Sequence, residues 1–99
     1  MPYAFIQDVP VNEKIYGQIR TMIGSDTPKG LVAHLAYKYE GGLRYVDVWD
    51  TQDDWHRFRD ARVEPAVGEV LAGLGIAQDP TQPKFEGIEL VDCWLGDRA

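Results

Sequence analysis

The chain has little cysteine and little positive charge, and each shortage excludes a class of protein. Its one cysteine, Cys93, can form neither an internal disulfide nor a cysteine-built metal site. Sixteen acidic residues outnumber ten basic ones, which gives a formal net charge of -6. Nucleic acid and anionic membrane surfaces both attract cationic proteins, so we expect neither as a partner.

Long apolar runs are also missing. No stretch approaches the ~18 apolar residues that a membrane helix needs. The first residues, Met-Pro-Tyr-Ala-Phe, lack the basic and apolar regions of a signal peptide. With the single cysteine, these absences predict a protein of the cytoplasm. A length of 99 residues predicts one domain over 1–99, with a thin core.

Apolar periodicity divides the chain into six elements. Alternating aromatic and β-branched residues predict strands at 3–9, 31–39, 43–49 and 85–95, and helical spacing predicts helices at 13–23 and 51–71. Asn12 and Thr51 suit helix N-caps, Gly24 suits a C-cap, and Pro65 predicts a kink or break in the second helix. Residues 77–84 are expected to form an exposed loop.

The order of these elements is β-α-β-β-α-β. It is typical of an α+β, ferredoxin-like fold, in which one antiparallel four-stranded sheet carries both helices on one face.

The hairpin around Gly41-Gly42 predicts which side chains share a face of the sheet. A turn at these glycines sets Tyr39 opposite Arg44 and His34 opposite Trp49. One face is then mostly apolar, and we expect the helices to cover it. The core predicted from this assignment contains Leu35, Tyr37, Val46, Val48, Ile15, Ile19, Phe58, Val63 and Val67.

The opposite face mixes aromatic and polar side chains. It carries Val32, His34, Ala36, Lys38, Leu43, Tyr45, Asp47 and Trp49. A broad aromatic patch is unfavourable in water, and the chain has no further helix to cover it. We therefore expect a homodimer, sheet on sheet, that encloses a partly polar cavity for a hydrophobic small molecule.

The residues that carry a family resemblance lie between positions 30 and 67. They are Gly30-Leu31-Val32-Ala33-His34, the run from Glu40 to Thr51 with its Gly-Gly…Asp-Val-Trp signature, and Trp55, Phe58, Arg59 and Pro65-Ala66. This pattern resembles small actinobacterial proteins of the dimeric α/β-barrel superfamily, which includes the antibiotic biosynthesis monooxygenases. The resemblance implies a homodimer whose two sheets close into a barrel.

Several activities occur among the better-known members of that superfamily: cofactor-free monooxygenases of polycyclic phenols, haem-degrading oxygenases, polyketide cyclases and small isomerases. The haem-degrading branch fits poorly, because its histidine and tryptophan positions align here with Gly68 and Phe58. The quinone-forming monooxygenases place Trp, Tyr, Asn and Arg around a phenol. Trp49 and Tyr45 match two of these, whereas the only asparagine is Asn12. The resemblance therefore implies chemistry without a bound cofactor.

His34 and Asp47 are the candidate catalytic residues. A neutral imidazole can take a proton near neutral pH, and a nearby carboxylate can orient it. Candidate ligand contacts are Trp49, Tyr45, Lys38 and Val32. The structural alternatives are a hydrogen-bonded histidine in an interface, an Asp47–Lys38 ion pair and a tryptophan that only packs. Two histidines without clustered acids predict no metal site, and Cys93 is expected to be buried.

Two classes of function follow. The first is a small cofactor-independent enzyme that acts on an aromatic or polyketide-like metabolite, as a monooxygenase or as a cyclase or isomerase of the same fold. The second is a non-catalytic dimer that binds a small molecule or is associated with stress.

Overall fold

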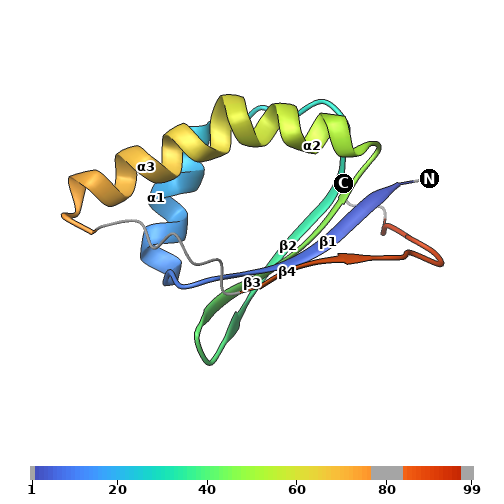
Figure 1. Cartoon of the computed structure of the whole chain (residues 1–99), viewed down its shortest axis with the longest axis horizontal. Helices are drawn as coiled ribbons and strands as arrows, with labels where there is room; N and C mark the ends of the chain where they lie inside the picture. Colours follow the sequence, from blue (N-terminus) through green and yellow to red (C-terminus); the bar gives the residue numbers. More distant parts are fainter. Residues whose placement is uncertain (1, 77–83, 97–99) are drawn as a thin grey trace.

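The computed structural model describes residues 2–76 and 84–96. Four strands, β1 (Tyr3–Val9), β2 (Leu31–Tyr39), β3 (Gly42–Trp49) and β4 (Lys84–Ile88), form one antiparallel sheet in the order β2-β3-β1-β4. The helices α1 (Glu13–Ile23), α2 (Gln52–Phe58) and α3 (Glu64–Gly73) lie on one side of this sheet (Figure 1). The predicted ferredoxin-like α+β fold is therefore confirmed. The predicted loop at 77–84 lies almost wholly outside the described residues.

The helix ends follow from short-range hydrogen bonds. Asn12 Oδ1 accepts from the backbone N–H of Ile15, and Thr51 Oγ1 accepts from that of Asp54, so both predicted N-caps are confirmed. The pKa of Asp54 is lowered, chiefly by the hydrogen bond with Thr51. Gly24 ends α1 at a φ of 102°, in the left-handed region that glycine favours.

The predicted break at Pro65 takes the form of a π-helical turn at Arg59–Val63, between α2 and α3. Proline cannot donate a backbone hydrogen bond, and its ring clashes with the carbonyl four residues earlier. The wider π turn relieves this crowding: the backbone N–H of Glu64 bonds to the Arg59 carbonyl, five residues back. The two helices therefore follow one another as a single curved rod above the sheet (Figure 1).

The β2–β3 hairpin turns one residue earlier than predicted, which shifts the pairing register by two residues. Tyr39 pairs with Gly42, so Glu40 and Gly41 form the turn. His34 consequently lies opposite Asp47, and Tyr37, rather than Tyr39, lies opposite Arg44. Because the register differs by two residues and strand side chains alternate, the predicted grouping of side chains on each face survives over most of the hairpin. A bulge at Val32 ends this regularity, and Leu31 pairs with Trp49.

The two sheet faces were assigned the wrong way round. The helices cover the aromatic and polar face: Trp55 of α2 packs on Phe5 and Trp49, and Leu31 joins them from beyond the bulge. The helix-free face carries Leu35, 61% exposed, and Tyr37, 48% exposed. The predicted burial of both side chains beneath the helices is therefore wrong. Val48 is buried as predicted, but from the helix-free side of the sheet.

The core has two parts. One is an aromatic cluster of Phe5, Trp49 and Trp55 between the sheet and α2. The other joins α1 to the π turn and α3 through Ile19, Ile23 and Ala66. The predicted core residues Ile15, Phe58, Val63 and Val67 pack against this second part, as expected.

β4 is shorter than predicted. The alternating pattern predicted a strand through Leu95, whereas pairing with β1 ends at Ile88. The residues that follow carry exposed apolar side chains, including Val91 and Trp94, and Trp94 is 92% exposed. The predicted burial of Cys93 is wrong, because Cys93 lies in this exposed segment.

Gly30, directly before β2, provides a test of this backbone. Its φ is +87°, and a Cβ there would overlap the Asp54 side chain. We expect Gly30→Ala to lower the free energy of unfolding by more than ~1 kcal/mol, because both strain and overlap oppose it. Gly17→Ala is the matched control. Gly17 lies within α1 with open space where a Cβ would stand, so this substitution should raise the free energy of unfolding by ~0.5–1 kcal/mol. Equal effects in urea unfolding would contradict the geometry at Gly30.

Candidate functional site

The centre of the site is a direct pair between β2 and β3. His34 Nδ1 lies 2.6 Å from Asp47 Oδ1, and the Asp47 side chain is only 6% exposed. A carboxylate can only accept hydrogen bonds, so Nδ1 of His34 carries the hydrogen in this pair. The Nε2 atom of a neutral His34 then carries no hydrogen and can accept one. The two predicted catalytic residues are therefore brought together, and more closely than in the predicted register, which sets His34 opposite Trp49.

A tyrosine of α1 completes the pair. The Tyr16 hydroxyl lies 2.8 Å from Nε2 of His34, and the two rings stack nearly parallel, at 5°. Because Nε2 bears no hydrogen in the neutral ring, the Tyr16 hydroxyl donates to it. Burial raises the pKa of Tyr16, although Arg20 one turn further along α1 opposes this. Tyr16 is therefore a protonated phenol at neutral pH.

Two further aromatic residues surround the three side chains. The Tyr45 ring meets the His34 ring edge-on, with centroids 5.2 Å apart, and it also contacts Tyr16. Burial raises the pKa of the Tyr45 hydroxyl well above its usual range. Trp49 donates its indole N–H to Asp47 Oδ2 across 3.2 Å and so fixes the second carboxylate oxygen. Trp49 is 1% exposed and offers no surface on which a ligand could stack.

Lys38 and Val32 lie apart from the central pair. Lys38 forms an exposed ion pair with Glu13 of α1, which raises the pKa of Lys38. The alternative of an Asp47–Lys38 ion pair is therefore wrong, because Asp47 pairs with His34. Val32 occupies the bulge. It lines neither the hollow beneath α1 nor the groove between α1 and α3.

A hollow opens beside the site, beneath α1. It has a volume of about 330 Å³ and is lined by Glu13, Tyr16, Ala36, Lys38 and Leu43. Its walls are apolar at Ala36 and Leu43, and the Lys38–Glu13 pair adds charge of both signs. This volume lies at the small end of the range for ligand pockets, so it suits a compact metabolite.

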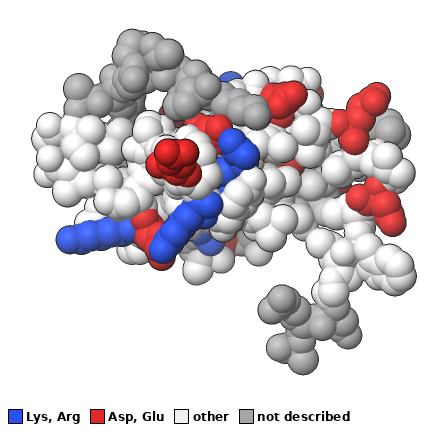
Figure 2. Space-filling view, turned by 90° about the horizontal axis from the view of Figure 1, so that it is seen from below, with Lys and Arg blue, Asp and Glu red and all other residues white. Residues whose placement is uncertain are grey.

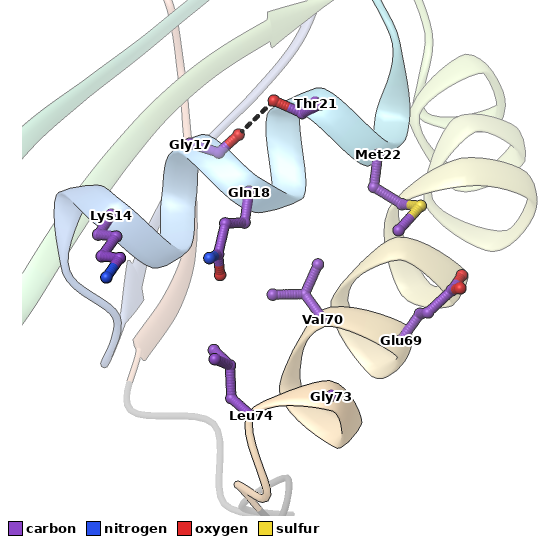
Figure 3. Close-up of a pocket in the computed structure, with 9 residues that line it drawn as sticks. All are labelled: Lys14, Gly17, Gln18, Thr21, Met22, Glu69, Val70, Gly73 and Leu74. Carbon is purple, nitrogen blue, oxygen red and sulfur yellow. Dashed lines mark hydrogen bonds between the residues drawn. The ribbon is translucent and has the colours of Figure 1, made fainter.

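A larger groove of about 660 Å³ separates α1 from α3 (Figure 3). Gln18, Met22, Val70 and Leu74 point toward it, and Lys14 and Glu69 stand at its margins. It mixes polar and apolar side chains in no arrangement that suggests chemistry. None of the side chains around His34 lines it.

Two further searches concern the described residues only. Within 2–76 and 84–96, no three His, Cys, Asp or Glu residues are grouped as a metal site would require. In the same part of the chain, no helix has the length and apolar character to cross a membrane.

Comparison with known proteins supports the fold. No family model matches the chain, and no curated protein matches its sequence. A solved structure from Chloroflexus aurantiacus J-10-fl, described as a proposed antibiotic biosynthesis monooxygenase, is similar over 95% of this chain and 97% of its own. The TM-score is 0.59 and the sequence identity 15%. The chain thus shares its ferredoxin-like fold with that structure.

Tyr16 is the site residue that sequence reasoning missed. The apolar spacing of Ile15, Ile19, Met22 and Ile23 predicts the first helix without Tyr16. Tyr16 stands three positions before Ile19 and seven before Ile23, on the stripe that faces the protein. A tyrosine on a buried stripe needs a hydrogen-bond partner for its hydroxyl, and this requirement was the available signal.

Proposed function

We propose that this protein is a small acid–base enzyme that acts on a hydrophobic aromatic or polyketide-like metabolite, in the manner of a cofactor-independent monooxygenase. The observation that carries the proposal is the His34–Asp47 pair beside an apolar-walled hollow. Asp47 keeps His34 in the tautomer that accepts a proton at Nε2 and stabilises the imidazolium that forms. The shared fold with a proposed antibiotic biosynthesis monooxygenase supports the same reaction class.

The reaction begins with removal of a phenolic proton. The O–H bond of the substrate breaks, the proton ends on His34 Nε2, and the electron pair stays on the phenolate oxygen. The electron-rich ring then reacts with dioxygen, which is the oxidant. One oxygen atom enters the ring, and the other leaves as water with two hydrogens from the substrate.

A cyclase or isomerase is the second candidate, and the same pair favours it because acid–base chemistry needs no oxygen. A panel of hydroxylated aromatic and polyketide compounds, with oxygen uptake and product mass followed together, separates the candidates. When isotopically labelled dioxygen is supplied, oxygen consumption together with one labelled oxygen atom in the product supports the monooxygenase. Product without oxygen consumption supports the cyclase or isomerase. Binding without product in every case would identify a binding protein and overturn the proposal.

We also propose a homodimer formed through the helix-free face of the sheet. Leu35, Tyr37 and Val46 contribute to this face, together with the Arg44–Asp8 ion pair. The view from below shows uncharged surface interrupted by acidic and basic side chains (Figure 2). The segment after β4 exposes Val91 and Trp94, although its pattern is that of a strand. An exposed apolar face beside an unpaired apolar segment is typical of an interface. A stable dimer of this kind buries more than ~2,000 Å² in total.

Leu35→Glu tests the interface. Leu35 is an exposed apolar residue on the edge strand β2 of this face, and a buried charge there should prevent association, so light scattering should give half the wild-type mass. Met22→Glu is the matched control, since Met22 is an exposed apolar residue on α1, and its mass should equal that of wild type. Retention of the dimer in Leu35→Glu would exclude this face. The predicted dimer face, which carries Tyr45 and Trp49, is covered by the helices. Tyr45→Glu and Trp49→Asp would therefore disturb the fold and do not test this interface.

A further inference from the structure

The hollow beside the site reaches one member of the hydrogen-bonded chain. Among Tyr16, His34 and Asp47, only Tyr16 lines it. The Tyr16 hydroxyl lies on Nε2 of His34, whose side chain is 27% exposed. A ligand in the hollow therefore contacts Tyr16, and through its hydroxyl it is linked to the imidazole.

The direction of the hydrogen bonds decides what Tyr16 can do. Asp47 fixes the hydrogen of His34 on Nδ1, so the Tyr16 hydroxyl gives its own hydrogen to Nε2. The Arg20 side chain also forms a hydrogen bond with Tyr16. A hydroxyl oxygen has two lone pairs, so one remains to accept from a ligand. The Tyr16 oxygen is thus an acceptor toward the hollow and a donor toward His34 at the same time, which is the arrangement of a proton relay.

We infer that Tyr16 passes the substrate's proton to His34 and that the site selects ligands with a hydroxyl, phenols or enols, over carbonyls and ethers. This inference rests on the proposed function and assigns its proton path. In the step, the ligand O–H breaks and a new Tyr16 O–H forms, while the former Tyr16 O–H breaks and a His34 Nε2–H forms. Tyr16 is neutral before and after, and the imidazolium faces Asp47.

The surroundings of Tyr16 suit this role. A relay residue must hold a proton at both ends of the step, and the raised pKa of Tyr16 keeps it protonated. The stacked Tyr16 and His34 rings and the Tyr45 ring across them hold the hydroxyl on Nε2. Ala36 and Leu43 give an aromatic ligand an apolar wall. A ligand that offers only a carbonyl or ether oxygen finds the Tyr16 hydrogen already committed to His34.

4-Nitrophenol is a suitable probe, because its phenolate is coloured and its phenol is not. The titration is made at a pH where the free compound is mostly protonated. We expect wild type to bind it and to raise the phenolate absorbance. Tyr16→Phe should lose this signal, His34→Gln should lose it as well, and Tyr3→Phe should keep it. Tyr3 is a matched control, a tyrosine on the same sheet face outside the hydrogen-bonded chain. 4-Nitroanisole, which lacks the hydroxyl, should bind more weakly than 4-nitrophenol in wild type.

The outcomes separate the relay from the proposed function. Phenolate formation in both wild type and Tyr16→Phe would overturn the relay and leave His34 as the direct base. Absence of phenolate in wild type, with nitrophenol or with nitronaphthol analogues, would count against the acid–base function itself and therefore also against the relay.

Nitrogen-15 NMR of the histidine rings tests the relay without any ligand. We expect the Nδ1–H tautomer for His34 in wild type, and a shift of the Nε2 resonance in Tyr16→Phe as its hydrogen bond is lost. The Tyr3→Phe spectrum should match that of wild type. A hydrogen on Nε2 in neutral His34 would make Tyr16 the acceptor there and would overturn the proton path.

Discussion

Replacing His34 with glutamine is expected to lower turnover of a phenolic or enolic substrate by about 10²–10⁴-fold, the usual cost of removing a positioned acid–base group. Glutamine can still form hydrogen bonds between Tyr16 and Asp47, but it cannot take a proton near neutral pH. The loss should therefore fall on turnover, while the circular dichroism spectrum and the light-scattering mass match those of wild type. The readout is the initial rate on a substrate found in the compound panel.

His56→Gln is the matched control for this variant. His56 lies on α2, away from the pair formed by His34 and Asp47. Its loss should change the rate by less than about twofold, because general acid–base effects require contact with the reacting group. Wild-type turnover in His34→Gln would place the chemistry on other residues and leave the hollow as a binding site only.

Phe5→Ala is expected to have the largest effect on stability, about 3–5 kcal/mol. Phe5 is 0% exposed and contacts Trp55 and Phe85, with ring centroids 4.8 and 4.7 Å away. Its removal leaves a cavity in the cluster that holds α2 on the sheet. Because domains of this size have a total stability of ~5–15 kcal/mol, the variant should be close to unfolded under mild denaturant.

Urea unfolding followed by tryptophan fluorescence measures this loss. Met22→Ala is the control: Met22 is 48% exposed on α1, so its truncation should stay within ~0.5 kcal/mol. Comparable losses in the two variants would mean that the aromatic cluster does not carry the contact between the sheet and α2.

Local elements were accessible from the sequence because their causes are local. The range 13–23 of the first helix and the caps Asn12 and Thr51 depend on contacts three or four residues apart. The disruption near Pro65 follows from the missing N–H and the clashing ring of this proline. These local causes do not determine that the disruption takes the form of a π turn. The element order then restricted the topology to the ferredoxin-like arrangement, which the structure confirms.

The hairpin register and the site geometry were only partly accessible. Two glycines in succession allow more than one turn, and the structure places the turn at Glu40-Gly41 because Gly42 fits closely beside the backbone of Val9. Such a contact between strands distant in sequence cannot be read from the hairpin itself. Alternation nevertheless put His34 and Asp47 on one face in either register, which is why their pairing survived the error.

The sequence by itself determined the elements, the element order and the two sets of side chains on the sheet. Only the tertiary structure decided which set faces the helices. Both faces are apolar enough to be buried, and apolar area does not say whether a helix or another chain covers it. The helices lie on this face because of contacts between residues distant in sequence. Phe5 and Trp49 pack on Trp55, and His34 forms a hydrogen bond with Tyr16. Burial of a polar pair is favourable only where donors and acceptors meet, and that geometry exists only after the helices are docked.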